Sequence, residues 1–265
     1  MRAAFAKHWP AYVFEAFGLG AFMVSACVFA ALLEHPHSPV RTALDDALIR
    51  RTLMGVAMGL TAVALIYSPW GRRSGAHINP AVTLTFLRLG RVERHDAFAY
   101  VVAQCLGAVL GVAACAAAGL PLAHESVNFV VTQPGRQGVA IAACAEFAIS
   151  FLLMAVVLSA SASPRLERWT GVLAGVCVAL FIAVEAPLSG MSMNPARTLG
   201  SALPSGQWRA WWIYVLAPLG GMLAAAELHT RVARRPIRCA KLRHCELVPC
   251  IFCGRKPLDP SPSLP

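Results

Sequence analysis

Charged residues are scarce in this chain of 265 residues. Asp, Glu, Lys and Arg make up 14% of it, against about 25% in average soluble domains. Acidic residues are the fewest, with 13 Asp and Glu in all. So little charge excludes a disordered chain and leaves too little polar surface for a soluble enzyme of this length. Gly and Pro follow no short period, which excludes a collagen-like chain.

What the chain has instead is apolar residues, which form 57% of it and collect in long runs. Each run is roughly 18–24 residues, enough to cross about 30 Å of hydrocarbon as a helix. Barrel strands would alternate over about 10 residues, so strands are excluded. The sequence therefore predicts an all-α membrane protein with six transmembrane helices, at Ala11–Leu33, Thr52–Pro69, Ala97–Leu120, Val139–Ala160, Thr170–Pro187 and Trp211–Leu228. The first run carries Glu15 and is long for a signal peptide, so we expect it to be retained.

The basic residues indicate the orientation. The net charge is +10, and most Lys and Arg fall at the N-terminus, in the connections after the second and fourth runs, and from Arg231 onward. Cytoplasmic segments of membrane proteins carry such an excess. We therefore expect both termini in the cytoplasm and no nucleic-acid partner.

Two segments are too short to cross and repeat each other. One reads Ser-Gly-Ala-His-Ile-Asn-Pro-Ala-Val-Thr over 74–83, and the other Ser-Gly-Met-Ser-Met-Asn-Pro-Ala-Arg-Thr over 189–198. One follows an even-numbered run and the other an odd-numbered run, so they start from opposite sides of the membrane. The sequence thus predicts two re-entrant half-helices in two inverted repeats, about 11–120 and 139–228.

The repeated Asn-Pro-Ala indicates what the half-helices do. Asn79 and Asn194 suit helix N-caps, and Pro80 and Pro195 suit the first helical position. Two helix N-termini that meet at the midplane repel cations, including protonated water. The Asn amides can donate to a neutral oxygen, and the preceding carbonyls can accept from it. This predicts a passive conduit for small neutral molecules, without catalysis or cofactor, around Asn79, Pro80, Ala81, Asn194, Pro195 and Ala196.

The two motifs, the six runs and the Arg that follows the second motif resemble the aquaporin, or major intrinsic protein, family over about residues 10–230. The resemblance implies a right-handed bundle of six tilted helices and two half-helices. It also implies a homotetramer in a cell membrane, in contact with lipid, with one pore per subunit for water and small neutral solutes. The chain then divides into a cytoplasmic N-terminus (1–10), a channel domain (11–230) and a basic tail (231–265).

Three polar residues within the runs are expected to support the re-entrant loops. Glu15 and Glu146 lie in corresponding runs of the two halves, and a carboxylate inside a membrane needs partners. We expect each to accept hydrogen bonds from the loop of its own half, a role that the resemblance supports. Gln104 is expected to hold the loop as well. A proton relay is the alternative for these groups. Members of the family often have a His in this loop near the inner mouth, so the resemblance implies that His77 lies there, where it either contributes to gating or satisfies backbone carbonyls.

The resemblance places Arg197 at an outer constriction, where it excludes cations and donates to the solute. Water-selective members have a His at the position of Ile182. The other predicted filter residues are Met191 and either Met58 or Gly59, which leaves an apolar opening. At Thr198 and Tyr214, by contrast, the chain resembles the water-selective members of the family more than the glycerol-conducting ones. We therefore expect water and small neutral solutes to pass, with a glycerol or small-polyol facilitator as the alternative.

Two other functions are less favoured. A secondary transporter also has inverted repeats and broken helices, but it needs coupling carboxylates that face the pathway. An intramembrane enzyme needs a nucleophile and base or a metal motif, and no such arrangement occurs in the runs.

The cysteines divide into two groups. Five lie in the runs and are expected to be small buried apolar residues. The other four, Cys239, Cys245, Cys250 and Cys253, lie in the tail beside His244 and form a weak candidate zinc site, since only the last pair has a common ligand spacing. We expect no metal, anionic lipid against Arg231–Arg243, and disorder from Lys256.

Overall fold

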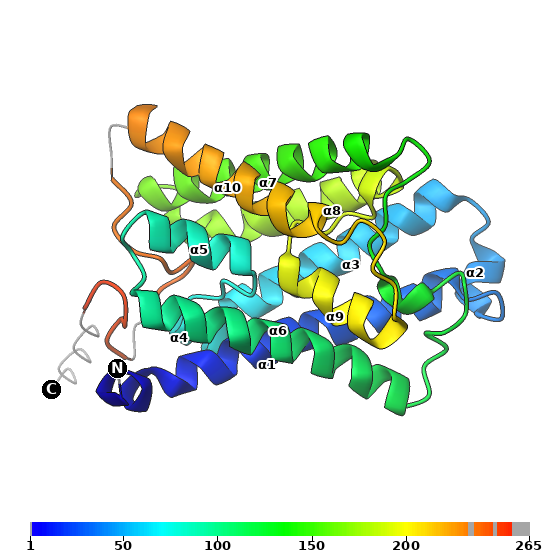
Figure 1. Ribbon diagram of the computed structural model, residues 1–265, viewed down its shortest axis with the longest axis horizontal. Helices are drawn as coiled ribbons and strands as arrows, with labels where there is room; N and C mark the ends of the chain where they lie inside the picture. The colour runs from blue at the N-terminus through cyan, green and yellow to red at the C-terminus, as the bar shows by residue number, and fades with distance from the viewer. Residues whose placement is uncertain (1, 233–235, 246–247, 256–265) are drawn as a thin grey trace, which may run out of the picture.

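The computed structural model describes residues 2–232, 236–245 and 248–255. Within these ranges it has helices, no strands, and six helices long and apolar enough to cross a membrane. The predicted all-α fold with six spans is confirmed. The spanning helices are α1 (Arg2–Glu34), α3 (Ala47–Tyr67), α6 (Arg94–Ala117), α7 (Val139–Ala162), α8 (Thr170–Ser189) and α10 (Ile213–Val232) (Figure 1).

The two half-helices are α5 (Pro80–Arg88) and α9 (Pro195–Ser205). Each starts at its predicted proline because the preceding Asn caps it. The Asn79 side-chain oxygen accepts from the Ala81 N–H at 2.8 Å, and that of Asn194 accepts from the Ala196 N–H at 3.1 Å. The local chemistry of Asn-Pro thus sets where both half-helices begin.

The bundle has two distinguishable ends (Figure 1). The start of α1 and the end of α10 lie at one, here called the terminal end, and the short helix α2 (Pro39–Ala43) lies at the other, the distal end. The half-helix α5 lies toward the terminal end and α9 toward the distal end. The half-helices therefore enter the bundle from opposite ends.

Small residues bring the spanning helices close together. A Cβ on Gly59 in α3 would lie 2.5 Å from the Gly175 carbonyl oxygen in α8, and one on Gly107 in α6 would lie 2.0 Å from the Ala16 carbonyl oxygen in α1. Backbones can approach this closely only where neither residue has a side chain in the way. These contacts fix the helices around the loops that carry the half-helices.

Helix boundaries differ from the predicted ones where polar residues cap the ends. The second span begins at Ala47 rather than Thr52, because the Asp46 carboxylate accepts from the N–H groups of Leu48 and Ile49. It ends at Tyr67, because Ser68 caps another helix, α4 (Pro69–Ser74). Hydropathy predicted neither α2 nor α4. Two 3-10 turns, η1 (Asn128–Val130) and η2 (Glu167–Trp169), lie in connections.

The described parts of the tail fold back across the terminal end of the bundle (Figure 1). Ile237, Ala240, Lys241 and Leu242 are buried there. The disorder predicted from Lys256 onward lies outside the described residues.

Candidate functional site

A buried carboxylate from α1 holds the first re-entrant loop. Glu15 has no exposed surface. One of its oxygens accepts from the Ser74 hydroxyl at 2.7 Å and the His77 N–H at 3.0 Å. The other accepts from the Ile78 N–H at 2.6 Å and the Gln104 amide at 2.8 Å. With four donors around it, this carboxylate is bound to the loop and does not face open space.

The second half repeats the arrangement from α7. Glu146 is also fully buried. It accepts from the Ser189 hydroxyl at 2.7 Å, the Ser192 N–H at 2.6 Å and the Met193 N–H at 2.7 Å. The two loops thus have one support design.

Two tyrosines that the sequence did not indicate as supports complete the scaffold. The Tyr100 hydroxyl donates to the Ser74 carbonyl at 2.7 Å, and the Tyr214 hydroxyl donates to the Ser189 carbonyl at 2.6 Å. Both side chains are fully buried. Their nearly equal distance after the two motifs was a signal that could have identified them. Tyr214 is a position at which the sequence resembles the water-selective members of the family. In the structure it is bonded to the second re-entrant loop and is not among the residues that line the cavity.

The loop backbone adopts the same uncommon conformation in both halves. Gly75 and Gly190 have positive φ angles of 109° and 83°. Four residues with side chains follow them in that region, namely Ala76, Ile78, Met191 and Met193, with φ between 40° and 53°. Such conformations persist only where surrounding contacts over-determine them. The carboxylates and tyrosines supply those contacts.

The two Asn residues link the half-helices to each other. The Asn79 amide donates to the Met193 carbonyl at 2.8 Å, and the Asn194 amide donates to the Ile78 carbonyl at 2.7 Å. An Asn amide has two N–H donors, so each keeps one for a molecule beside it. Asn79 is 7% exposed and Asn194 8% exposed. The adjoining Ala81 and Ala196 are fully buried, and Pro80 and Pro195 start the half-helices.

A cavity of about 240 Å³ passes both Asn residues. Residues from both halves line it, including Met58, His77, Asn79, Ile182, Met191, Asn194 and Arg197. Of the two positions left open for the filter, Met58 lies on this wall, whereas Gly59 packs against α8. Glu15, Glu146 and Gln104 lie behind the wall.

Arg197 is the charged residue beside the Asn pair. Its guanidinium donates to the Val130 carbonyl at 2.7 Å. An Arg has five N–H donors, so this contact fixes the side chain and leaves donors for a solute. Val130 belongs to the connection around η1, and nothing in the sequence pointed to it.

His77 lies on the cavity wall toward the terminal end, and it is 2% exposed. Its Nε2 lies 2.9 Å from the Ala240 carbonyl oxygen, and its Nδ1 lies 3.1 Å from the Thr83 hydroxyl. A carbonyl can only accept, so Nε2 carries the proton in this arrangement. The ring stacks on Phe86 and on Phe252 of the tail, at centroid distances of 5.2 and 5.7 Å. Both ring nitrogens are therefore engaged, one of them with the tail.

The sequence and the fold are similar to those of known proteins. The family described as Major intrinsic protein matches residues 2–229. Aquaporin NIP1-1 of Oryza sativa subsp. japonica is 35% identical over 192 residues, which is 71% of this chain and 66% of the relative. Aquaporin NIP1-2 of Arabidopsis thaliana is 35% identical over 213 residues, 75% of this chain and 69% of the relative.

The alignment with the Oryza sativa relative, and that with Aquaporin NIP1-1 of Arabidopsis thaliana, cover slightly less than two thirds of the relative's own length. Among solved structures, the aquaglyceroporin from Plasmodium falciparum superposes with a TM-score of 0.71 and 16% identity, over 86% of this chain and 97% of that one. At this identity the likeness concerns the fold alone.

Proposed function

The chain belongs to the major intrinsic protein family, and from this premise we propose that it is a passive channel for water and small neutral solutes that excludes ions and protons. The observation that carries the proposal is the cavity that passes both Asn residues and Arg197. No catalytic activity and no cofactor belong to this proposal.

The polar groups of the cavity suit a neutral solute that donates and accepts hydrogen bonds. The free N–H of each Asn amide can donate to its oxygen, and backbone carbonyls of the strained loops can accept from it. A cation would meet the positive ends of α5 and α9 and the Arg197 guanidinium. Moving a charge past these groups without compensating partners is costly.

A secondary transporter is disfavoured by the place of its possible coupling groups. Glu15 and Glu146 are fully buried and accept hydrogen bonds from the re-entrant loops. Carboxylates that bind a coupled ion would have to face the pathway.

Glycerol or a small polyol is the second candidate solute, and apolar side chains in the wall of the cavity that Arg197 also lines favour it. The cavity is lined by the apolar side chains of Ile182, Met191 and Met58. A His in place of Ile182 would narrow the cavity and bind water. The apolar wall accommodates the carbon backbone of a polyol while Arg197 binds its hydroxyls.

Stopped-flow light scattering on proteoliposomes tests both candidates with water and glycerol gradients. We expect faster volume changes than in empty vesicles, and no dissipation of a proton gradient. Equal rates in protein-containing and empty vesicles for both gradients would overturn the channel proposal.

Ile182→His tests whether the apolar wall admits glycerol. We expect it to lower glycerol flux more than water flux. Val184→His on the same helix is the matched control, because Val184 is 76% exposed on the outer face. Equal effects of the two substitutions would show that Ile182 does not set the opening.

We further propose a homotetramer in the cell membrane with both termini in the cytoplasm. Large apolar side chains cover the outer face, among them Leu60, Leu110 and Val184. They suit lipid contact and subunit contact. Light scattering in detergent tests the tetramer, and accessibility of terminal tags in intact cells tests the orientation.

A further inference from the structure

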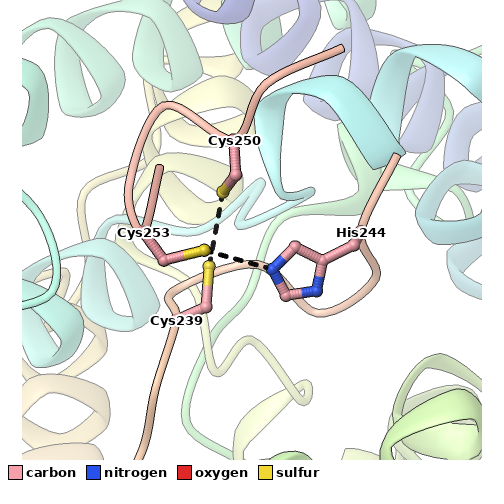
Figure 2. A group of neighbouring side chains, drawn as sticks. All are labelled: Cys239, His244, Cys250 and Cys253. Atoms are coloured by element: carbon pink, nitrogen blue, oxygen red, sulfur yellow. Dashed lines mark hydrogen bonds between the residues drawn. The ribbon is translucent and has the colours of Figure 1, made fainter. Parts of the chain in front are cut away.

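Four side chains of the tail converge on one point. The ligand atoms of Cys239, His244, Cys250 and Cys253 all lie within 4.8 Å of one another (Figure 2). The sequence had suggested Cys245 as a member of such a group. In the structure its neighbour His244 takes that place, and Cys245 lies outside the group.

The spacing of these atoms suits a tetrahedral metal ion. Zinc with Zn–S of about 2.3 Å and Zn–N of about 2.0 Å requires two sulfurs about 3.8 Å apart and a sulfur and nitrogen about 3.5 Å apart. Here the Cys239 and Cys250 sulfurs are 3.5 Å apart, and the Cys253 sulfur lies 3.5 Å from His244 Nε2. Three thiolates and an imidazole are ligands that favour zinc over harder cations.

A backbone turn and the carboxylate of Glu167 also suit a metal site at these four residues. Gly254 follows the Cys250–Cys253 pair with φ of 67°, and its N–H donates to the Cys250 carbonyl at 3.0 Å. This turn brings both sulfurs to one side. On the other side of the ring, His244 Nδ1 lies 3.5 Å from a Glu167 oxygen in η2. Metal-bound histidines commonly have such a partner on the second nitrogen.

The segment between Cys239 and His244 lies against the terminal mouth of the cavity. The Lys241 ammonium donates to the Arg72 and Arg73 carbonyls at 3.1 and 2.6 Å, at the end of α4. The Leu242 N–H donates to the Gly75 carbonyl at 3.2 Å. The Leu242 side chain is buried and lines the cavity together with His77.

We propose that Cys239, His244, Cys250 and Cys253 bind one Zn²⁺, and that the bound metal holds Leu242 across the terminal mouth and lowers permeation. The second half of this statement rests on the proposed channel function. Zinc binding releases the thiol protons, and the binding free energy becomes folding free energy of the tail. Without zinc the tail keeps its hydrogen bonds, the burial of Ile237, Ala240 and Leu242, and the stacking of Phe252 on His77, but no coordinate bond links Cys239 and His244 to Cys250 and Cys253. The segment that carries Leu242 would then be held less firmly, and the side chain would occupy the mouth for a smaller share of the time.

Metal analysis of the full-length protein tests the site without reference to permeation. We expect about one zinc per chain in protein purified from zinc-supplemented cells. Co²⁺ in its place should give the visible bands of a tetrahedral thiolate complex. Cys250→Ser/Cys253→Ser should lose both signals, and Cys245→Ser is the matched control that keeps them. Absence of metal with a Cys239–Cys250 disulfide in the mass spectrum, or loss of metal in Cys245→Ser, would overturn the proposed ligand set.

Stopped-flow water flux tests the closure. We expect a zinc chelator to raise the permeability of the parent protein and of Cys245→Ser. Leu242→Ala and Cys250→Ser/Cys253→Ser should start at the raised level and not respond. If all proteins conduct alike with and without zinc, the closure is wrong and the channel function stands. If none conducts, including Leu242→Ala, the proposed channel function itself fails, whatever the metal analysis shows.

Discussion

Replacing Glu146 by Gln tests whether the buried carboxylate holds the second re-entrant loop. Glu146 accepts three hydrogen bonds, from the Ser189 hydroxyl and from the N–H groups of Ser192 and Met193. Glutamine keeps one oxygen. In its better orientation that oxygen serves Ser189 and Ser192, and the new NH₂ group confronts the Met193 N–H.

The cost follows from the one bond lost. A buried hydrogen bond to a charged group contributes about 1.5–3 kcal/mol. The two bonds that are kept weaken, but a neutral amide costs less to bury than a carboxylate, which offsets that loss. We therefore expect about 2 kcal/mol of destabilisation. At about 2–4 °C per kcal/mol for a chain of this size, the melting temperature should fall by about 4–8 °C.

Circular dichroism in detergent measures the shift, and Glu227→Gln is the control. Glu227 is an exposed carboxylate paired with Arg88 and Arg231 on the surface, and such pairs contribute about 0–1 kcal/mol. Water permeability of Glu146→Gln should fall as well, because the displaced loop carries Asn194. If the two variants melt alike, the carboxylate is not what holds the loop.

Three further predictions concern other parts of the chain. Arg197→Ala removes the positive charge beside the Asn pair, so proteoliposomes that carry it should leak protons, as a pH-sensitive dye would report. Gly59→Val places a Cβ 2.5 Å from the Gly175 carbonyl oxygen, so the protein should fail to accumulate in membranes. The N–H groups of Ile49 and Leu48 hold the pKa of Asp46 below its usual value. The Asp46 cap therefore stabilises α3 at pH values above the usual pKa of an aspartate. This stabilisation is lost as the pH falls through the lower pKa that Asp46 has in the folded protein. The difference in melting temperature between the parent and Asp46→Ala should shrink over that range.

The parts of the fold that could be predicted are those that short-range chemistry decides. Pro80 and Pro195 start the half-helices because the Asn before each one caps the helix two residues on. Spans could be counted because hydropathy is a property of the run itself. Their boundaries were less accurate, since a cap such as Asp46 lies outside the apolar run and hydropathy does not register it.

The parts that could not be predicted depend on contacts between distant segments. Met58 and Gly59 are neighbours in sequence, but successive helical residues point about 100° apart, so only the packing of α3 on α8 decides which one faces the cavity. In the tail, the spacing of the residues in the sequence does not tell whether His244 or Cys245 belongs to the proposed zinc site. The fold of the tail brings His244 and not Cys245 to the other three ligands. Glu167, which lies in another connection, contacts the second nitrogen of His244.

The two halves share one arrangement of supporting residues, and the positions at which they differ make the two ends of the cavity unlike. Ser192 occupies in the second loop the place of His77 in the first, and it contacts Thr198 as His77 contacts Thr83. The serine is too short to reach further, whereas the imidazole also binds the tail carbonyl of Ala240. Arg197 stands where the first motif has a valine. Two differences between the repeated halves thus place a cation, Arg197, on the distal side of the Asn pair. On the terminal side they place His77, which binds the tail. In the proposed channel, these two groups would select the solute at the distal mouth and control its passage at the terminal mouth.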